Sequence, residues 1–223
     1  MGKHIELTAS DGHKFSAYVA EPSGKPKGAL IVVMEIFGVN SHIRGVTDQY
    51  AADGYLAIAP QFFDRAQKGL DVGYTGQDLE LARSLMQKMN LNDPLKDVEA
   101  AKAHVSSAGK VGIIGYCWGG SLAFKSAANV NGLACAVAYY GGSIPNIVDE
   151  KPKCPVMFHW GEIDQSIPLE KAKMVAEKHK DQIHHFYPGA GHGFNCDQRA
   201  SFNAESSKLA RERTLEFLRK HIG

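Results

Sequence analysis

The chain of 223 residues is 44% hydrophobic and 22% charged, and its formal net charge is +1 at pH 7. This composition is typical of a soluble globular protein and excludes a disordered or membrane-embedded chain. Lys and Arg are spread along the sequence without a basic block, so we expect neither a nucleic acid nor a membrane surface as partner. The length fits one large domain or two small ones, and we predict a single α/β domain over residues 1–223.

The N-terminal region and the cysteines indicate the compartment. The first residues contain no apolar signal segment, and no later run approaches the roughly 18 apolar residues that cross a membrane. The four cysteines, Cys117, Cys135, Cys154 and Cys196, form no C-x-x-C pair and no zinc-type spacing. Free thiols fit a reducing compartment, so we predict a cytoplasmic protein.

The first third of the chain alternates strand and helix patterns. Two alternating runs joined across Asp11-Gly12 predict an antiparallel hairpin over residues 5–8 and 14–19, at the edge of a sheet. The uniformly apolar run 29–34 predicts a central parallel strand. A helix is expected over 43–51 from its 3.6-residue spacing, and a second buried strand follows it at 55–60.

The rest of the chain continues this alternation. Residues 62–76 show weak periodicity and are expected to form a loop that covers a site. Asp93-Pro94 predicts the N-cap and first residue of a helix. We predict further helices at 77–89, 94–107, 169–179 and 201–221 and further strands at 111–114, 133–139, 155–160 and 183–187. The result is a mostly parallel sheet with helices on both faces and an antiparallel N-terminal hairpin.

One stretch, Gly115-Tyr116-Cys117-Trp118-Gly119-Gly120, lies between a predicted strand and a segment that begins a helix. The pattern G-x-C-x-G in this context is that of a nucleophile elbow with cysteine in place of serine. A thiol at the first turn of a helix lies near free N–H groups and the helix dipole, which favour the thiolate. We therefore predict Cys117 as a nucleophile, whereas Cys135 and Cys154 are interpreted as core residues and Cys196 stays undecided.

A cysteine nucleophile needs a base and a group that orients the base. Asp164 and His192 each follow a predicted strand directly, so both lie at carboxyl ends of strands. The chain order nucleophile, acid, histidine is that of α/β-hydrolase triads. In that arrangement the backbone N–H groups of Ile36 and Trp118 are the expected oxyanion hole. Taken alone, Asp164 is more often a turn residue and His192 a loop residue. The prediction therefore rests on their combination with the elbow.

Further residues are candidates for binding the substrate, a cofactor or a metal. Glu35 ends an apolar strand, where an unpaired acid is costly, so a site role is favoured over a capping role. Phe37, next to it, is expected to line the substrate pocket. His192 and Cys196 have i, i+4 spacing without further ligands nearby in the sequence. Since no P-loop and no G-x-G-x-x-G pattern is present, we predict no cofactor and no metal.

Four motifs in this order, Glu35-Ile36-Phe37-Gly38, the elbow, Gly161-Glu162-Ile163-Asp164 and Gly191-His192-Gly193-Phe194, resemble the dienelactone hydrolase (carboxymethylenebutenolidase) family over nearly the whole chain. The resemblance implies an α/β-hydrolase fold, with Cys117 as nucleophile, His192 as base and Asp164 as its orienting acid. It also implies that Glu35 contacts the thiol in the resting site. Members of the family open an unsaturated lactone through an acyl-enzyme.

The chain departs from the family pattern at the arginines that hold the substrate carboxylate. The family arginine four residues after the catalytic histidine is replaced by Cys196. A second family arginine lies in the region of residues 77–89, where Arg83 is found without a clear match. Arg199 is the expected substitute. The family resemblance therefore supports the type of reaction more strongly than the identity of the substrate. We predict that the substrate is a small lactone or ester.

Two other functions remain open from the sequence. A broad carboxylesterase for neutral esters needs no arginine for a substrate carboxylate. A thiol sensor or ligand-binding protein on the same scaffold has a reactive Cys117 without turnover. The complete set of nucleophile, base and acid favours an enzyme. The oligomeric state, monomer or small homo-oligomer, is left open.

Overall fold

The computed structural model describes residues 2–223, and all strands in this part of the chain belong to one sheet. The strands are β1 (Lys3–Thr8), β2 (Lys14–Ala20), β3 (Ala29–Val33), β4 (Leu56–Pro60), β5 (Val111–Tyr116), β6 (Leu133–Tyr139), β7 (Val156–Gly161) and β8 (Ile183–Tyr187). They lie in the order β1-β2-β4-β3-β5-β6-β7-β8. The β1–β2 and β2–β4 pairs are antiparallel and the other pairs parallel. The predicted hairpin and mostly parallel sheet are thus confirmed.

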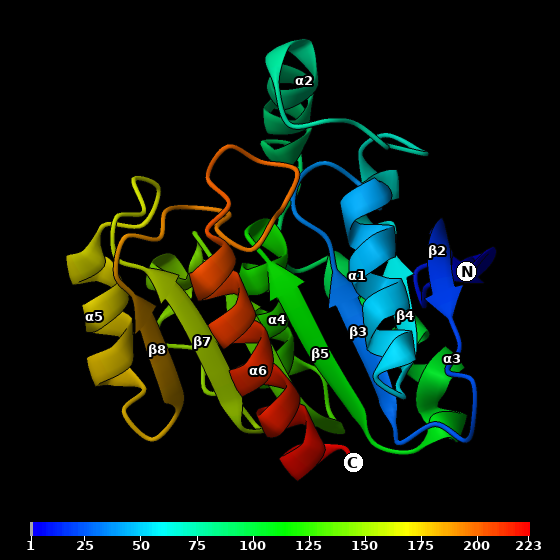
Figure 1. Ribbon diagram of the computed structural model, residues 1–223. Helices are drawn as coiled ribbons and strands as arrows, with labels where there is room; N and C mark the ends of the chain where they lie inside the picture. Colours follow the sequence, from blue (N-terminus) through cyan, green and yellow to red (C-terminus); the bar gives the residue numbers. More distant parts are fainter. Residues whose placement is uncertain (1) are drawn as a thin grey trace.

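Helices cover both faces of this sheet (Figure 1). They are α1 (Ser41–Ala52), α2 (Gly76–Met86), α3 (Pro94–Val105), α4 (Trp118–Asn129), α5 (Leu169–Lys178) and α6 (Ala204–His221). In the view of Figure 1, α1 and α6 lie in front of the sheet and α4 lies behind it, against β5 and β6. The helix α2 stands beyond the carboxyl ends of the parallel strands. Those strand ends are where an α/β sheet places its ligands.

The segment after β4 differs from the predicted loop. It begins with a short 3₁₀ helix, Phe62–Arg65, and α2 ends three residues before the predicted boundary, at Met86. Phe63 is fully buried with its ring centroid 5.1 Å from that of Trp118. Asp64 fixes the turn, because Oδ2 accepts from Ser16 N (2.9 Å) and Oδ1 from Gly69 N (2.7 Å). One anchored turn is too short to produce a periodic sequence pattern.

The predicted start of α3 is correct and Asp93 occupies the predicted N-cap position, but its side chain does not bond to the helix end. Pro94 is the first residue of the helix. The side chain of Asp93 makes no capping hydrogen bond, and its backbone is already helical. Asn90 Nδ2 donates to Asp93 Oδ2 at 2.7 Å instead. The carboxylate therefore closes the preceding turn rather than the helix end.

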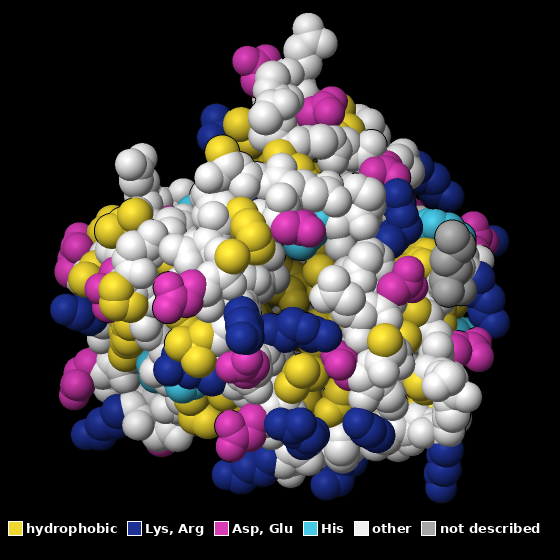
Figure 2. Space-filling view, viewed as in Figure 1, with side chains coloured by type: hydrophobic (Ala, Val, Ile, Leu, Met, Phe, Trp, Pro, Cys, Tyr) yellow, Lys and Arg dark blue, Asp and Glu magenta, His cyan; other side chains and the backbone are white. Residues whose placement is uncertain are grey.

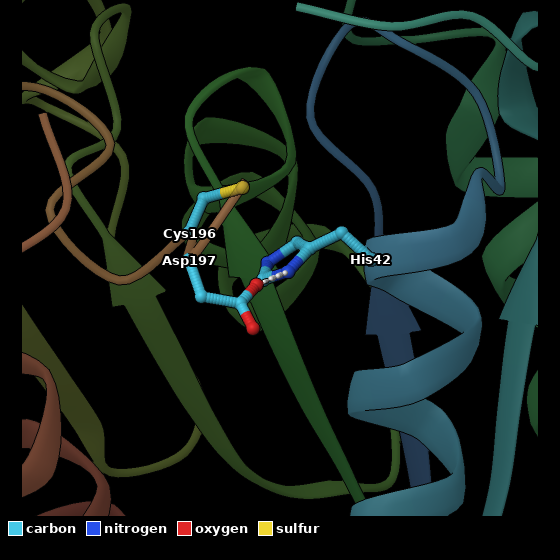
Figure 3. A group of neighbouring side chains, drawn as sticks. All are labelled: His42, Cys196 and Asp197. Carbon is cyan, nitrogen blue, oxygen red and sulfur yellow. Dashed lines mark hydrogen bonds and ion pairs between the residues drawn. The ribbon is translucent and has the colours of Figure 1, made fainter. Parts of the chain in front are cut away.

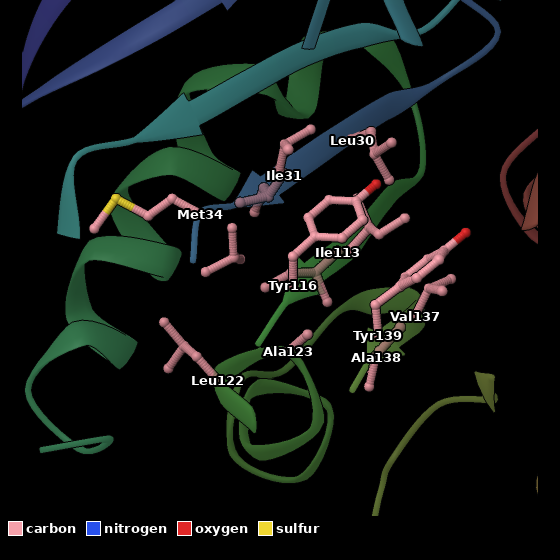
Figure 4. Packing of buried hydrophobic residues seen from close by; sticks show 14 of the residues in the cluster. Leu30, Ile31, Met34, Ile113, Tyr116, Leu122, Ala123, Val137, Ala138 and Tyr139 are labelled. Atoms are coloured by element: carbon pink, nitrogen blue, oxygen red, sulfur yellow. The ribbon is translucent and has the colours of Figure 1, made fainter. Parts of the chain in front are cut away.

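The hydrophobic core lies around β3, β5 and β6. Figure 4 shows apolar side chains of these strands packed against Leu122 and Ala123 of α4. Ile31, Ile113 and Val137 are fully buried. Because both faces of these strands are covered, their sequences are continuous apolar runs without alternation.

The surface has a mixed charge distribution. On the face shown in Figure 2, Lys and Arg side chains are interspersed with Asp and Glu, as expected from a formal net charge of +1. Within residues 2–223, no helix combines the length and the apolar composition that a membrane crossing requires.

Backbone packs directly on backbone where α4 approaches β3. A Cβ added at Gly119 would lie 2.3 Å from the carbonyl oxygen of Met34 and 2.6 Å from that of Val33. Real Cβ atoms do not approach oxygens so closely, so only glycine permits this contact. The start of α4 is thereby held against the carboxyl end of β3.

We predict that Gly119→Ala lowers the free energy of unfolding by about 3 kcal/mol, because the added methyl group must push α4 away from the sheet. Gly45→Ala is the matched control, since a Cβ at Gly45 in α1 meets no atom within 4 Å. That substitution should raise the free energy of unfolding by about 0.5–1 kcal/mol. Urea unfolding of both variants measures the difference, and wild-type stability of Gly119→Ala would contradict the packing argument.

Candidate active site

Cys117 joins β5 directly to α4 in a strained backbone conformation. Its φ of 55° and ψ of −117° lie in a region that residues with a side chain rarely adopt. The turn is held by hydrogen bonds from Cys117 N to Tyr139 O and from Gly120 N to Cys117 O, both 3.0 Å. A Cβ at Gly115 would lie 1.9 Å from the carbonyl oxygen of Gly119. The flanking glycines thus provide space, while the positive φ falls on the cysteine itself.

The three residues predicted as nucleophile, base and acid meet at the carboxyl ends of β5, β7 and β8. His192 Nε2 lies 3.0 Å from Cys117 Sγ. His192 Nδ1 lies 2.8 Å from Asp164 Oδ2. The structure therefore brings a thiol, an imidazole and a carboxylate into one hydrogen-bonded chain, which is the geometry that activates a nucleophile.

Asp164 is held by the turn that follows β7. Its Oδ1 accepts from the backbone N–H groups of Ser166 (2.7 Å) and Ile167 (3.0 Å). The residue is 5% exposed. Because one oxygen is occupied by the turn, the other faces His192, and this fixes the orientation of the imidazole.

The surroundings of His192 favour its charged form. Burial lowers the pKa of this imidazole, but the Cys117 sulfur and the Asp164 carboxylate outweigh burial and raise the pKa to about 10. The charged imidazole is therefore the form that these two neighbours favour.

A cavity of about 320 Å³ opens onto Cys117. Trp118 is the first residue of α4 and one of the two expected oxyanion donors, and its N–H group has no partner within the helix. Ile36, the second expected donor, lines the same cavity. The lining residues are Ile36, Phe37, Leu79, Arg83, Met86, Cys117, Trp118, Ser121, Gly142, Ser143, Ser166, His192 and Arg199. The predicted oxyanion and substrate-binding residues thus surround the thiol.

Glu35 pairs with Arg199, whereas the family resemblance implied a contact with the thiol. Its Oε1 accepts a hydrogen bond from Arg199 Nη1 at 2.8 Å, and no hydrogen bond joins it to Cys117 within the described residues. Glu35 is 1% exposed, and its Oε2 has no hydrogen-bond partner in this part of the chain. A buried carboxylate is costly without a charged partner. Arg199, in the segment after His192, provides this partner.

Arg199 is enclosed by aromatic rings as well as by this ion pair. Its guanidinium carbon lies 5.8 Å from the ring centroid of Phe37 and 5.7 Å from that of Tyr74. A Cβ at Gly193 would lie 2.5 Å from Arg199 Nη1, so this glycine makes room for the side chain. Burial lowers the pKa of Arg199, but the negative charges of Glu35 and Cys117 raise it overall. Arg199 therefore remains charged at the wall of the cavity.

The helix α2 supplies three cavity residues, of which the sequence interpretation named only Arg83. Leu79, Arg83 and Met86 line the cavity and lie four and three residues apart. This spacing places them on one face of the helix. The spacing of these three residues is visible in the sequence, but no neighbouring residue indicates that this face of α2 turns toward Cys117.

A second group of possible ligands lies beside the site. His42, Cys196 and Asp197 place one donor atom each within 4.8 Å of one another (Figure 3). His42 Nδ1 lies 3.1 Å from Asp197 Oδ1, and Ser41 Oγ donates to Gln198 Oε1 at 3.0 Å. These contacts fix the segment that carries Arg199 against the beginning of α1.

Cys196 itself is fully buried in this group. Burial and the Glu35 carboxylate raise the pKa of its thiol to about 11. Metal ions and electrophiles both require the thiolate, which this environment opposes. We therefore assign Cys196 to packing, and the absence of a metal stays a prediction.

Comparison with known proteins places this geometry in a family. The model of the "Dienelactone hydrolase family" matches residues 15–222. The carboxymethylenebutenolidase of Pseudomonas putida is 33% identical over 225 residues, covering 96% of this chain and 94% of that protein. Carboxymethylenebutenolidase 1 of Cupriavidus pinatubonensis is 31% identical over 226 residues, covering 96% and 95%.

Solved structures agree with the sequence comparison. A candidate dienelactone hydrolase from Klebsiella pneumoniae superposes with a TM-score of 0.86 at 30% identity, covering 98% of this chain and all of that one. A dienelactone hydrolase-like promiscuous phosphotriesterase, P91, shares the fold with a TM-score of 0.82 at 17% identity, covering 100% and 99%. The sheet order and these neighbours confirm the predicted α/β-hydrolase fold. The chain belongs to the dienelactone hydrolase family.

Proposed function

We propose that the chain hydrolyses small lactones or esters through an acyl-enzyme formed on Cys117. Membership of the dienelactone hydrolase family supports a carboxylic ester hydrolase. The observation that carries the cysteine mechanism is the 3.0 Å contact between Cys117 Sγ and His192 Nε2, with Asp164 behind the imidazole. A cysteine that only packs in the core does not require an imidazole and a carboxylate beside its sulfur.

The first half of the cycle forms the thioester. The Cys117 sulfur attacks the carbonyl carbon, and the carbonyl oxygen becomes negatively charged. The N–H groups of Trp118 and Ile36 stabilise this oxygen, a contribution of about 2.7–4 kcal/mol for each donor. As the C–O bond breaks, protonated His192 gives its Nε2 proton to the leaving oxygen.

The second half releases the acid. Neutral His192 takes a proton from water, whose oxygen attacks the thioester carbon. The C–S bond breaks, the acid leaves, and Cys117 returns as a thiolate beside protonated His192. Asp164 keeps the imidazole in position through both steps. The cycle uses only side chains and backbone groups of this chain.

The arginines of the cavity support an acyl group that carries a carboxylate, as a dienelactone does. Arg83 and Arg199 both line the cavity that opens onto Cys117. Arg199 is already paired with Glu35, so Arg83 offers the charge that an anionic substrate would take. The Glu35–Arg199 pair also favours a second candidate, a carboxylesterase for neutral esters, because it neutralises one of the two arginine charges at the cavity.

We predict that iodoacetamide alkylates Cys117 at pH 6.5 about 10- to 100-fold faster in the wild type than in His192→Gln, since an isolated thiol is only about 1% ionised at that pH. Mass spectrometry of the Cys117 peptide measures the rate. Cys154 is the internal control, because burial raises its pKa to about 11 and His192 does not contact it. Equal Cys117 rates in the two proteins would refute activation by the imidazolium.

Cys117→Ala should reduce hydrolysis of 4-nitrophenyl acetate by about 10⁴-fold or more, because a triad without its nucleophile retains only binding and oxyanion stabilisation. Wild-type protein should accumulate an acetyl group on Cys117 in rapid-quench mass spectrometry. Undiminished hydrolysis by Cys117→Ala would show that the nucleophile assignment is wrong. Alkylation of Cys117 without any steady-state hydrolysis would instead support a thiol sensor.

Arg83→Met should lower kcat/KM for a carboxylate-bearing dienelactone by about tenfold or more, because a charge-assisted hydrogen bond is lost. The kcat/KM for the neutral ester 4-nitrophenyl acetate should change by less than about twofold, because this substrate carries no carboxylate. Lys88→Met is the control, since it removes a positive charge just after α2 and outside the cavity. Equal losses on both substrates would contradict recognition of a substrate carboxylate by Arg83.

A further inference from the structure

A second cavity, of about 490 Å³, adjoins the first at His192 and Ser166, which line both. Its walls come from three loop segments: residues 163–166 after β7, residues 189–192 after β8 and residues 200–203 before α6. The candidate site thus continues past the His192 imidazole into a space that the first cavity does not include.

The rim of this second cavity exposes large apolar side chains. Ile163 is 63% exposed and Phe202 is 40% exposed, and both line the cavity. Within residues 2–223, the other exposed large hydrophobic residues are Met174, Ile183 and Leu209. Apolar surface of this kind beside a reactive group is typical of a binding site, because a ligand that covers it releases water.

The charge of the second cavity differs from that of the first. The lining residues are Ile163, Gln165, Ser166, Gly189, Gly191, His192, Ala200, Ser201, Phe202 and Asn203. His192 is the sole ionisable residue among them. The first cavity, in contrast, contains Arg83 and Arg199. A neutral group with apolar atoms therefore fits the second cavity, and an anionic group fits the first.

The chemistry of acyl transfer places the two halves of an ester on either side of the reacting carbon. The leaving oxygen takes its proton from His192 Nε2, so that oxygen must lie within hydrogen-bond reach of the imidazole. The carbon chain attached to it then continues on the side of His192. In a lactone the leaving oxygen stays tethered to the acyl chain, and one cavity holds both. A separate alcohol requires a second space.

We propose that the cavity formed by Ile163, Phe202 and their neighbours is an alcohol subsite, which takes the apolar alkyl or aryl alcohol of a neutral ester. This inference rests on the proposed cysteine mechanism. In the acylation step the S–C bond forms, the C–O bond breaks, and the proton of His192 passes to the alkoxide oxygen. The alcohol then leaves through the second cavity while the acyl group stays on Cys117.

Acetate esters of methanol, butanol and hexanol test the proposal, because all three form the same acetyl-enzyme and differ only in the alcohol. Their kcat/KM values therefore report acylation alone. We expect kcat/KM of the wild type to rise about twofold for each methylene, or about 30-fold from methyl to hexyl, since full burial of a methylene gives about fourfold. Ile163→Ser and Phe202→Ser should each reduce the hexyl-to-methyl ratio by about threefold or more.

Met174→Ser is the matched control, because Met174 is 39% exposed on α5 and lines neither cavity. Its hexyl-to-methyl ratio should equal that of the wild type. A wild-type ratio near one, or a ratio unchanged by Ile163→Ser and Phe202→Ser, would overturn the alcohol subsite while leaving the cysteine mechanism intact. Failure of all three acetates together with absence of an acetyl group on Cys117 would overturn the proposed function instead.

Discussion

The backbone conformation of Cys117 is the constraint on which the rest of the site depends. A positive φ at a residue with a side chain costs about 1–3 kcal/mol and persists only where the surroundings impose it. Here Gly115 and Gly119 let β5, α4 and the end of β3 pack backbone to backbone, and the single residue that joins β5 to α4 takes the positive φ. The thiol is therefore presented at one fixed point, and the turns after β7 and β8 need only reach it.

The fold and the reactive chain of residues could be predicted because both leave local signals. Strands buried on two faces are continuous apolar runs, and helices show their 3.6-residue spacing. Parallel strands place their carboxyl ends at one edge of the sheet, so residues that follow strands directly, such as Asp164 and His192, meet there. The role of the elbow glycines was less visible, since they provide space rather than unusual φ angles.

The partners of the residues that wall the site could not be predicted, because they depend on contacts between distant segments. Glu35 pairs with Arg199 across 164 residues, and Arg199 lies in a segment without regular secondary structure. The cavity face of α2 and the anchored turn at Phe62 depend in the same way on how loops cross the sheet. A single sequence indicates that such groups exist. It does not give their partners, which is why the reaction was easier to predict than the substrate.

One short segment after β8 carries His192 at its beginning and Arg199 near its end, and it walls both cavities. Contacts of Ser41 and His42 with Gln198 and Asp197 attach that segment to α1. The length of this segment therefore has to place both His192 and Arg199 correctly. An insertion or deletion between the two residues changes the position of the His192 imidazole relative to the Arg199 guanidinium. Side-chain replacements along this segment leave that spacing unchanged, so we expect them to alter the cavity walls without displacing either residue.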